Sequence, residues 1–328
     1  MTLYLTLAFA GMALGLVLTP LVSKGSAMLG LVDAPGGRKV HSVSVPRLGG
    51  LAIASAAALA LLAAALGHRS AQVPQAMASV SPILIGGGLV FVVGLLDDVR
   101  PLSPWPKLIV QVAGAFIVMQ AGLRIERITI AGGSWQLGLS SWPVTLVWIV
   151  GLTNAFNLID GVDGLAAGIA TIAGTTCAVI LIARGHVAEA MLLAALVGAA
   201  IGFLVFNFPP ASIFLGDSGS LLFGFVLATT AITGWQKGAT ALAAGIPILM
   251  FALPIADAAT TLVRRVLRGG ATRSVSLSTL AARIVEPDRH HIHHRLLALG
   301  FSTRGTVLLL YGITIVLSAV ALATAQLD

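Results

Sequence analysis

The stretch 154–165 reads N-A-F-N-L-I-D-G-V-D-G-L and carries two amides and two carboxylates at a spacing of three: Asn154, Asn157, Asp160 and Asp163. On a helix this spacing drifts slowly around one face, so the four side chains are predicted to form one polar stripe. The stripe follows an apolar segment that is expected to cross a membrane. Carboxylates at membrane depth are costly and usually mark function. The stripe is therefore the first candidate site.

A second acidic group, Asp97 and Asp98, closes the apolar run G-L-L-D-D-V-R. Adjacent carboxylates repel each other unless a cation or a shared proton relieves them. The pair could bind Mg²⁺ or accept a proton from a phosphate nucleophile, and a solvated helix end is the alternative. Lys107 and Gln111 share a face of the next apolar run, where Lys107 could hold a phosphate or anchor the helix at the membrane interface.

The string F-N-F-P-P-A-S-I-F-L-G-D-S-G-S at 206–220 contains Asn207 and Asp217 around a Pro-Pro turn. A carboxylate, an amide and hydroxyls suit Mg²⁺, a hard cation that takes few protein ligands. Asp217 could instead cap the start of the next helix. Capping explains one residue of the string and leaves the others unexplained.

Cationic and imidazole side chains gather in two further segments. From Asp33 to Gly50 the chain reads D-A-P-G-G-R-K-V-H-S-V-S-V-P-R-L-G-G, and from Asp288 to Arg295 it reads D-R-H-H-I-H-H-R. The first could contact phosphate or simply hold charge on the inner side of a membrane. The second suggests zinc at first sight, but no cysteine is near and hydrogen bonds to a sugar or diphosphate fit better. The candidate binding residues are Arg38, Lys39, His41, Arg47, His291, His293, His294 and Arg295.

Membrane spans are the elements that must position these groups. The 328 residues are 57% hydrophobic and 9% charged, with a mean hydropathy of +1.00, which is typical of a polytopic membrane protein. The sequence predicts an all-α single domain over 1–328, with a small β-hairpin in 123–141 and a His-rich loop at 266–304. Ten runs approach the ~20 residues that a span needs: 2–22, 48–67, 80–96, 107–123, 142–159, 164–184, 190–207, 219–234, 240–264 and 305–325.

Basic residues predict the orientation of these spans. With the N-terminus outside, 14 of the 19 Lys and Arg residues fall on inner segments and 5 on outer ones, in agreement with the positive-inside rule. Ten spans then place both termini and the hairpin outside. Nearly all the acidic motifs fall on the inner side. The net charge of +7 is accordingly a topology signal and not a nucleic-acid surface. We expect one cytoplasmic active-site cleft.

Taken together and in this order, the motifs resemble the polyprenyl-phosphate N-acetylhexosamine-1-phosphate transferases over essentially the whole chain. P-R-L-G-G and H-I-H-H look like the WecA-like branch, whose members start O-antigen, enterobacterial common antigen or teichoic-acid linkage units. The resemblance implies Mg²⁺-dependent transfer, with Mn²⁺ as a possible substitute, of a sugar 1-phosphate from a UDP-N-acetylhexosamine to undecaprenyl phosphate, releasing UMP. It also implies a bacterial inner-membrane homodimer.

The resemblance further implies roles for the motif residues. Asp217 would be the principal Mg²⁺ ligand, and Asp97 and Asp98 would position or deprotonate the lipid phosphate and contact the metal. Asn157, Asp160, Asp163 and Asn207 would line the nucleotide and metal pocket, and the loop of His291, His293, His294 and Arg295 would contact the diphosphate and sugar. N-acetylglucosamine is the default sugar, with N-acetylfucosamine and N-acetylgalactosamine as alternatives.

Two other classes of function remain open from the residues. A cation-coupled transporter would use acidic residues near the middle of spans, and Asp257 alone approaches such a position. A non-catalytic lipid-binding membrane protein would have no use for the full acidic set.

Overall fold

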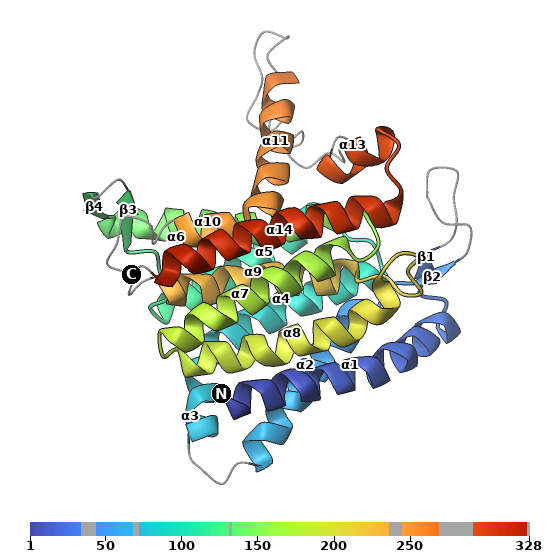
Figure 1. Ribbon diagram of the computed structural model, residues 1–328, viewed down its shortest axis with the longest axis horizontal. Helices are drawn as coiled ribbons and strands as arrows, with labels where there is room; N and C mark the ends of the chain where they lie inside the picture. The colour runs from blue at the N-terminus through green and yellow to red at the C-terminus, as the bar shows by residue number, and fades with distance from the viewer. Residues whose placement is uncertain (34–43, 68–71, 131–132, 236–244, 269–290, 327–328) are drawn as a thin grey trace.

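The computed structural model describes residues 1–33, 44–67, 72–130, 133–235, 245–268 and 291–326. Its long helices run side by side in one bundle (Figure 1). Within the described residues, seven helices are long and apolar enough to cross a membrane, so the chain is a multi-pass membrane protein. They are α1 (Thr2–Met28), α2 (Gly49–Gly67), α4 (Ser81–Val99), α6 (Ser141–Ile159), α7 (Leu165–Ala183), α8 (Val187–Asn207) and α14 (Thr303–Gln326).

Two further long helices belong to the same bundle. They are α5 (Pro104–Gln120) and α9 (Gly216–Trp235), and α9 packs against α2, α4, α6 and α7. Shorter helices connect or flank the bundle: α3 (Gln72–Ser79), the 3₁₀ turn η1 (Gly138–Ser140) and α13 (Ile292–Ala298). The prediction of an all-α membrane fold is confirmed, whereas the total of ten spans remains a prediction.

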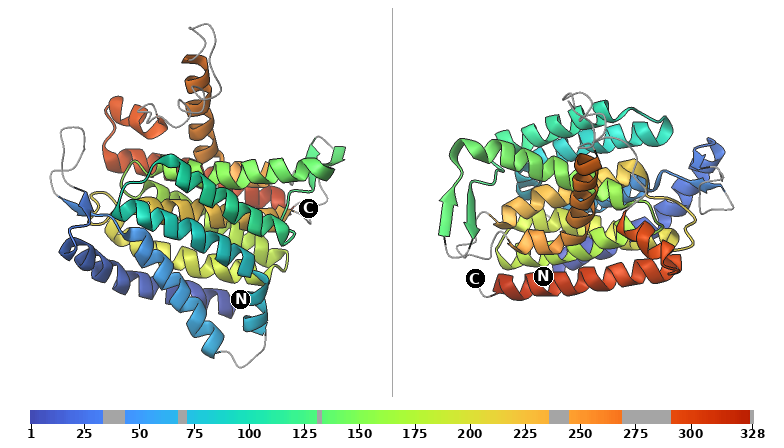
Figure 2. Two further views of the ribbon diagram at one scale, coloured as in Figure 1. Left: turned by 180° about the vertical axis from the view of Figure 1, so that it is seen from behind. Right: turned by 90° about the horizontal axis from the view of Figure 1, so that it is seen from above.

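The predicted ninth span, 240–264, is not one straight helix. Residues 240–244 lie outside the described part of the chain, and the remainder forms α10 (Gly245–Met250) and α11 (Ala252–Arg268), with a break at Phe251. Pro247 lies in α10 and Pro254 in the first turn of α11, and a proline donates no backbone hydrogen bond. The prolines thus account for the break, and α11 leaves the side of the bundle (Figures 1 and 2).

Two small antiparallel sheets mark opposite ends of the bundle. β1 (Val32–Asp33) pairs with β2 (Val45–Pro46), and β3 (Arg127–Ile130) pairs with β4 (Gly133–Gln136). The second pair confirms the hairpin predicted in 123–141. Figure 1 shows β3, β4 and both chain ends toward one end of the bundle, and β1, β2 and α13 at the other.

Candidate functional site

The polar stripe at 154–165 is divided between a helix and a turn. α6 ends at Ile159, Asp160 is its C-cap residue, and Gly164 adopts φ 74° immediately before α7. The predicted continuous helical face is therefore wrong beyond Ile159, because the glycines of D-G-V-D-G allow the chain to turn. Asn154 and Asn157 remain on α6, while Asp160 and Asp163 lie in the turn 160–164.

Six carboxylates from four separate stretches of chain line one cavity of about 450 Å³, namely Asp33 and five that belong to the predicted acidic motifs. Asp97 and Asp98 come from the end of α4, Asp160 and Asp163 from the turn after α6, and Asp217 from the start of α9. The structure thus brings together the predicted acidic motifs. The remaining lining residues are Asp33, Arg47, Pro101, Gly161, Val162, Asn207, Phe214, Leu215 and Gly216.

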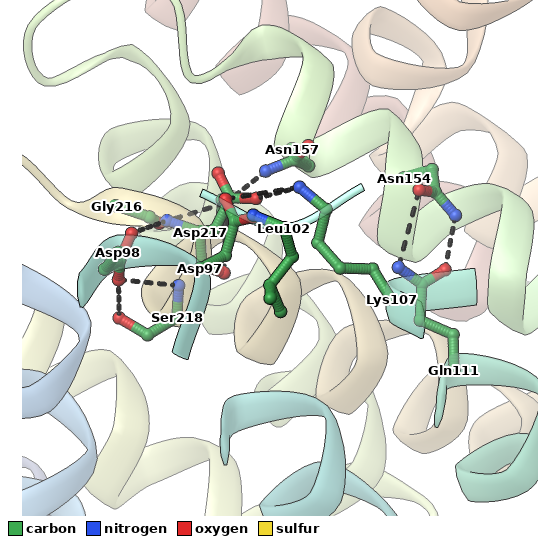
Figure 3. Close-up of polar contacts among 11 residues, drawn as sticks. Asp97, Asp98, Leu102, Lys107, Gln111, Asn154, Asn157, Gly216, Asp217 and Ser218 are labelled. Carbon is green, nitrogen blue, oxygen red and sulfur yellow. Dashed lines mark hydrogen bonds and ion pairs between the residues drawn. The ribbon is translucent and has the colours of Figure 1, made fainter. Parts of the chain in front are cut away.

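Lys107 bridges two of these carboxylates. Its Nζ lies 2.8 Å from Oδ2 of Asp217 and 3.3 Å from Oδ2 of Asp97 (Figure 3). Asp97 also accepts a 2.7 Å hydrogen bond from the backbone N–H of Leu102. An ammonium group therefore already neutralises part of the acidic cluster, and Lys107 is more than an interfacial anchor.

Asp98 caps the start of α9 from a different helix. Its Oδ1 accepts the backbone N–H of Asp217 at 2.7 Å, and its Oδ2 accepts the backbone N–H and the hydroxyl of Ser218 at 3.1 and 2.5 Å (Figure 3). A carboxylate at this position also faces the positive end of the helix dipole. Asp98 thus caps α9 as well as lining the cavity, and Asp217 lines the cavity beside it. Sequence reasoning missed Ser218, although it directly follows Asp217.

Asn207 and Asp163 join two of the chain segments that line the cavity. Asn207 accepts the backbone N–H of Gly164 at 3.1 Å and donates to the carbonyl of Ile213 at 2.9 Å. Asp163 accepts the backbone N–H of Ala211 at 2.9 Å. Because these bonds join the turn 160–164 to the Pro-Pro segment, Asn207 and Asp163 shape the cavity as well as line it.

The two amides on α6 behave differently from each other. Asn157 donates to the hydroxyl of Ser220 at 3.0 Å, close to Asp217 (Figure 3). Asn154 pairs with Gln111 of α5, donating at 2.5 Å, and also donates to the carbonyl of Val150. Asn154 is not among the residues that line the acidic cavity, so the structure gives it a helix-joining role and not the predicted substrate contact.

The crowded acids perturb one another. Burial, and after it the negative charges of Asp217, Asp98 and Asp163, raise the pKa of Asp160 well above its ordinary value. A cation or cationic side chain near Asp160 would relieve this repulsion. The site therefore has the electrostatic character of a cation or phosphate–cation pocket.

Of the predicted cationic group in 33–50, the structure describes one member. Arg47 lines the cavity and forms an ion pair with Asp33. Asp33 was not a predicted site residue, although it opens the same glycine-rich motif. Arg38, Lys39 and His41 lie outside the described residues.

The described part of the histidine segment belongs to α13 and its N-cap. Its side chains contact different parts of the molecule. His293 is 2% exposed and lies against Gly161, where an added Cβ would come within 2.7 Å of its Nε2. Burial, with a smaller contribution from His294, lowers the pKa of His293 to about 4, so the ring is neutral at pH 7. His291 is buried against Asp257 of α11, and Arg295 lies on a separate surface. Neither is among the residues that line the acidic cavity, where both were expected to contact substrate.

A second cavity of about 400 Å³ adjoins the first across the turn 160–164. It is lined by Gly161, Val162, Asp163, Pro209, Pro210, His294, Leu297, Ser302, Thr303 and Arg304. Arg304 donates from Nε to the carbonyl of Pro209 at 2.8 Å. No sequence motif distinguishes Arg304 from the other basic residues of the inner segments.

The acidic cavity suits a hard cation held partly by substrate. The candidate metal ligands in this cavity are the carboxylate oxygens of aspartates, which favours Mg²⁺ over zinc. Within the described part of the chain, no three His, Cys, Asp or Glu side chains converge closely enough to hold a metal by themselves. Mg²⁺ commonly binds one or two carboxylates and completes its shell with water and phosphate oxygens. The residues therefore fit Mg²⁺ bound together with a phosphorylated substrate.

The fold and the cavity define a class: a multi-pass membrane protein with an acidic, lysine-bridged pocket suited to a metal–phosphate ligand. Comparison with known proteins is more specific, since the pattern of glycosyl transferase family 4 matches residues 80–235. The chain is 35% identical over 316 residues to the probable undecaprenyl-phosphate N-acetylglucosaminyl 1-phosphate transferase of Bacillus subtilis (strain 168), covering 95% of this chain and 83% of that protein.

Relatives from other bacteria carry names of the same class of transferase. Identity is 34% with the decaprenyl-phosphate N-acetylglucosaminephosphotransferase of Mycolicibacterium smegmatis, covering 86% of this chain and 72% of that protein. It is 27% with the undecaprenyl-phosphate alpha-N-acetylglucosaminyl 1-phosphate transferase of Escherichia coli (strain K12), covering 88% and 74%. The chain belongs to the polyprenyl-phosphate N-acetylhexosamine-1-phosphate transferase family, as its motifs predicted.

Proposed function

We propose that this protein transfers N-acetylglucosamine 1-phosphate from UDP-N-acetylglucosamine to undecaprenyl phosphate, forming the lipid-diphosphate sugar and UMP. The observation that carries the proposal is the convergence of the three acidic motifs on one cavity at one end of a membrane bundle, where Lys107 forms ion pairs with two of the lining carboxylates. The names of the relatives supply the substrate class. We place the cavity at the cytoplasmic face of the bacterial inner membrane, because UDP-sugars are made in the cytoplasm.

Asp217 and Asp97 would hold Mg²⁺ in this cavity, with Mn²⁺ as a substitute. The ion would neutralise negative charge on the diphosphate of the UDP-sugar. Lys107, bonded to both carboxylates, would turn toward a phosphate oxygen when substrate and metal enter. Arg47 lines the same cavity and would bind a further phosphate oxygen.

The lipid phosphate would attack directly. Its oxygen forms a bond to the phosphorus that bears the sugar, and the bond between that phosphorus and the bridging oxygen of the diphosphate breaks, so that UMP leaves with the bridging oxygen. A phosphate monoester with a second pKa of about 6 is already largely a dianion at neutral pH, so no strong base is required. Both oxygens of Asp98 accept hydrogen bonds from α9, which disfavours Asp98 as a covalent nucleophile and suits it to orienting Asp217.

The structure gives less support to other substrates and to other classes of function. UDP-N-acetylfucosamine or UDP-N-acetylgalactosamine would use the same chemistry, and the sugar would be selected near His294 and the 266–304 segment. A transporter would need Asp257 free to carry cations, whereas this carboxylate is bonded to His291 and to the backbone N–H of Ile292. By analogy with the family, we further propose that the product initiates O-antigen or teichoic-acid synthesis and that the protein is a homodimer.

The test is turnover by the purified full chain with labelled UDP-N-acetylglucosamine, undecaprenyl phosphate and Mg²⁺. We expect UMP and a labelled lipid, and no product after EDTA treatment until Mg²⁺ is restored. Release of UDP would indicate an ordinary glycosyltransferase, and no turnover with any UDP-hexosamine would contradict the proposal. Asp217→Asn should abolish turnover while its thermal midpoint stays near that of the native chain. Glu126→Gln, the same change on the exposed hairpin, should remain fully active.

A further inference from the structure

A buried carboxylate outside the acidic cavity joins α11 to α13. Asp257 is 1% exposed, and its Oδ2 lies 2.7 Å from Nδ1 of His291. Its Oδ1 accepts the backbone N–H of Ile292 at 2.7 Å. A buried carboxylate is costly unless each oxygen has a partner. Here both partners come from the start of α13, since His291 is its N-cap and Ile292 its first residue.

The contacts continue from His291 to the wall of the acidic cavity. The ring of His291 is 6% exposed and stacks nearly parallel on His293, with 5.6 Å between centroids and 8° between planes. His293 in turn lies against Gly161, which lines the cavity between Asp160 and Asp163. Asp257 is thus linked to the cavity wall through two stacked rings, although it is not among the residues that line the cavity.

α13 depends on this attachment for its position. It has seven residues, and a helix of about two turns is not stable in isolation. It is also placed between a helix that leaves the bundle, α11, and the long α14. The Asp257 carboxylate fixes its first turn, and the contact of His293 with Gly161 fixes its orientation over the turn 160–164.

We infer that Asp257 is a positioning residue of the transferase, which holds α13 so that His293 supports the turn 160–164 and His294 faces the adjoining cavity. The inference rests on the proposed function. It reassigns His291 from a substrate contact to a member of this linkage. The substrate whose binding depends on Asp257 is then the UDP-sugar, and not the lipid phosphate.

The kinetic test compares Asp257→Asn, His291→Ala and the double variant in the full chain. We expect each single change to raise KM for UDP-N-acetylglucosamine by about ten- to a hundredfold, the range for losing a hydrogen bond to a charged group, with KM for undecaprenyl phosphate within about twofold. The double variant should resemble the singles, because both break one linkage. Glu126→Gln is the matched carboxylate-to-amide control.

A spectroscopic readout separates this role from a general loss of fold. Leu299, at the end of α13, is 76% exposed, and the sole native cysteine, Cys177, is 2% exposed and should not be labelled. A spin label on Leu299→Cys should become more mobile when Asp257→Asn is added. An unchanged KM and an unchanged label mobility in an active protein would overturn the inference. An inactive native chain would instead contradict the proposed function, and His291→Ala provides the same test if Asp257→Asn fails to fold.

Discussion

Lys107 occupies the position between two carboxylates that a divalent cation would also favour. Its ammonium group contacts Asp217 at 2.8 Å and Asp97 at 3.3 Å. A lysine on a flexible stem can move away by rotation of its side chain, which a backbone donor cannot do. The residue therefore stabilises the acidic pair in the free protein and becomes available to phosphate when a metal takes its place.

Replacing Lys107 by Gln should tighten metal binding while lowering turnover. Two unit charges ~4 Å apart near a protein surface interact by about 4 kcal/mol, so loss of even part of this repulsion should lower the Kd for Mn²⁺ roughly tenfold. Electron paramagnetic resonance of free Mn²⁺, without substrate, measures this directly. Lys24→Gln, on the exposed end of α1, controls for the loss of one positive charge. Equal or weaker Mn²⁺ binding in Lys107→Gln would contradict this account of the lysine.

At the scale of elements, the geometry of the acidic cavity depends on how closely α4 approaches α9. Gly94 lies on α4 three residues before Asp97, and a Cβ there would come within 2.7 Å of the carbonyl oxygen of Asp217. The missing side chain allows the ends of the two helices to touch, which in turn allows Asp98 to reach the start of α9. Helix packing in membranes commonly uses small residues in this way.

Gly94→Ala should therefore separate Asp97 and Asp98 from Asp217. We expect the thermal midpoint to fall, in line with about 1–3 kcal/mol for overpacking, and turnover to fall at least roughly tenfold because the carboxylates are displaced. Gly88→Ala is the matched control, since a Cβ there meets no atom within 4 Å on the same helix. Normal turnover in Gly94→Ala, or an equal loss in both variants, would show that this close approach is not required.

The elements also show which features a single sequence can predict. Apolar runs and grouped acids predicted the spans and the acidic cavity, because composition and spacing carry that information directly. The apolar run 142–159 predicted the end of α6 at Ile159. The continuation of the helical stripe to Asp163 was wrong, since a spacing of three is equally compatible with a helix and with a turn that contains Gly161 and Gly164. The contacts Asp98–Ser218 and Asp257–His291 join residues 120 and 34 positions apart, and no local pattern reports such pairs.

At the scale of the whole molecule, the bundle has two different ends. The acidic cavity is formed by chain segments beside β1 and β2, whereas β3, β4 and both chain ends lie toward the other end (Figures 1 and 2). The basic residues were assigned to inner segments from the sequence alone, and Arg47, Lys107 and Arg304 all border the two cavities or bind their carboxylates. Charge and architecture thus favour the same orientation, with the cavities in the cytoplasm.

Cysteine labelling in spheroplasts tests this orientation, because the buried Cys177 leaves the native chain without an accessible thiol. Ser134→Cys places a thiol on exposed β4 and Leu299→Cys places one at the end of α13. A membrane-impermeant maleimide should label Ser134→Cys in intact spheroplasts and should label Leu299→Cys only after the membrane is opened. The native chain, treated in parallel, should stay unlabelled. The reverse pattern would place the acidic cavity outside the cell, where UDP-sugar is absent, and would be incompatible with the proposed reaction.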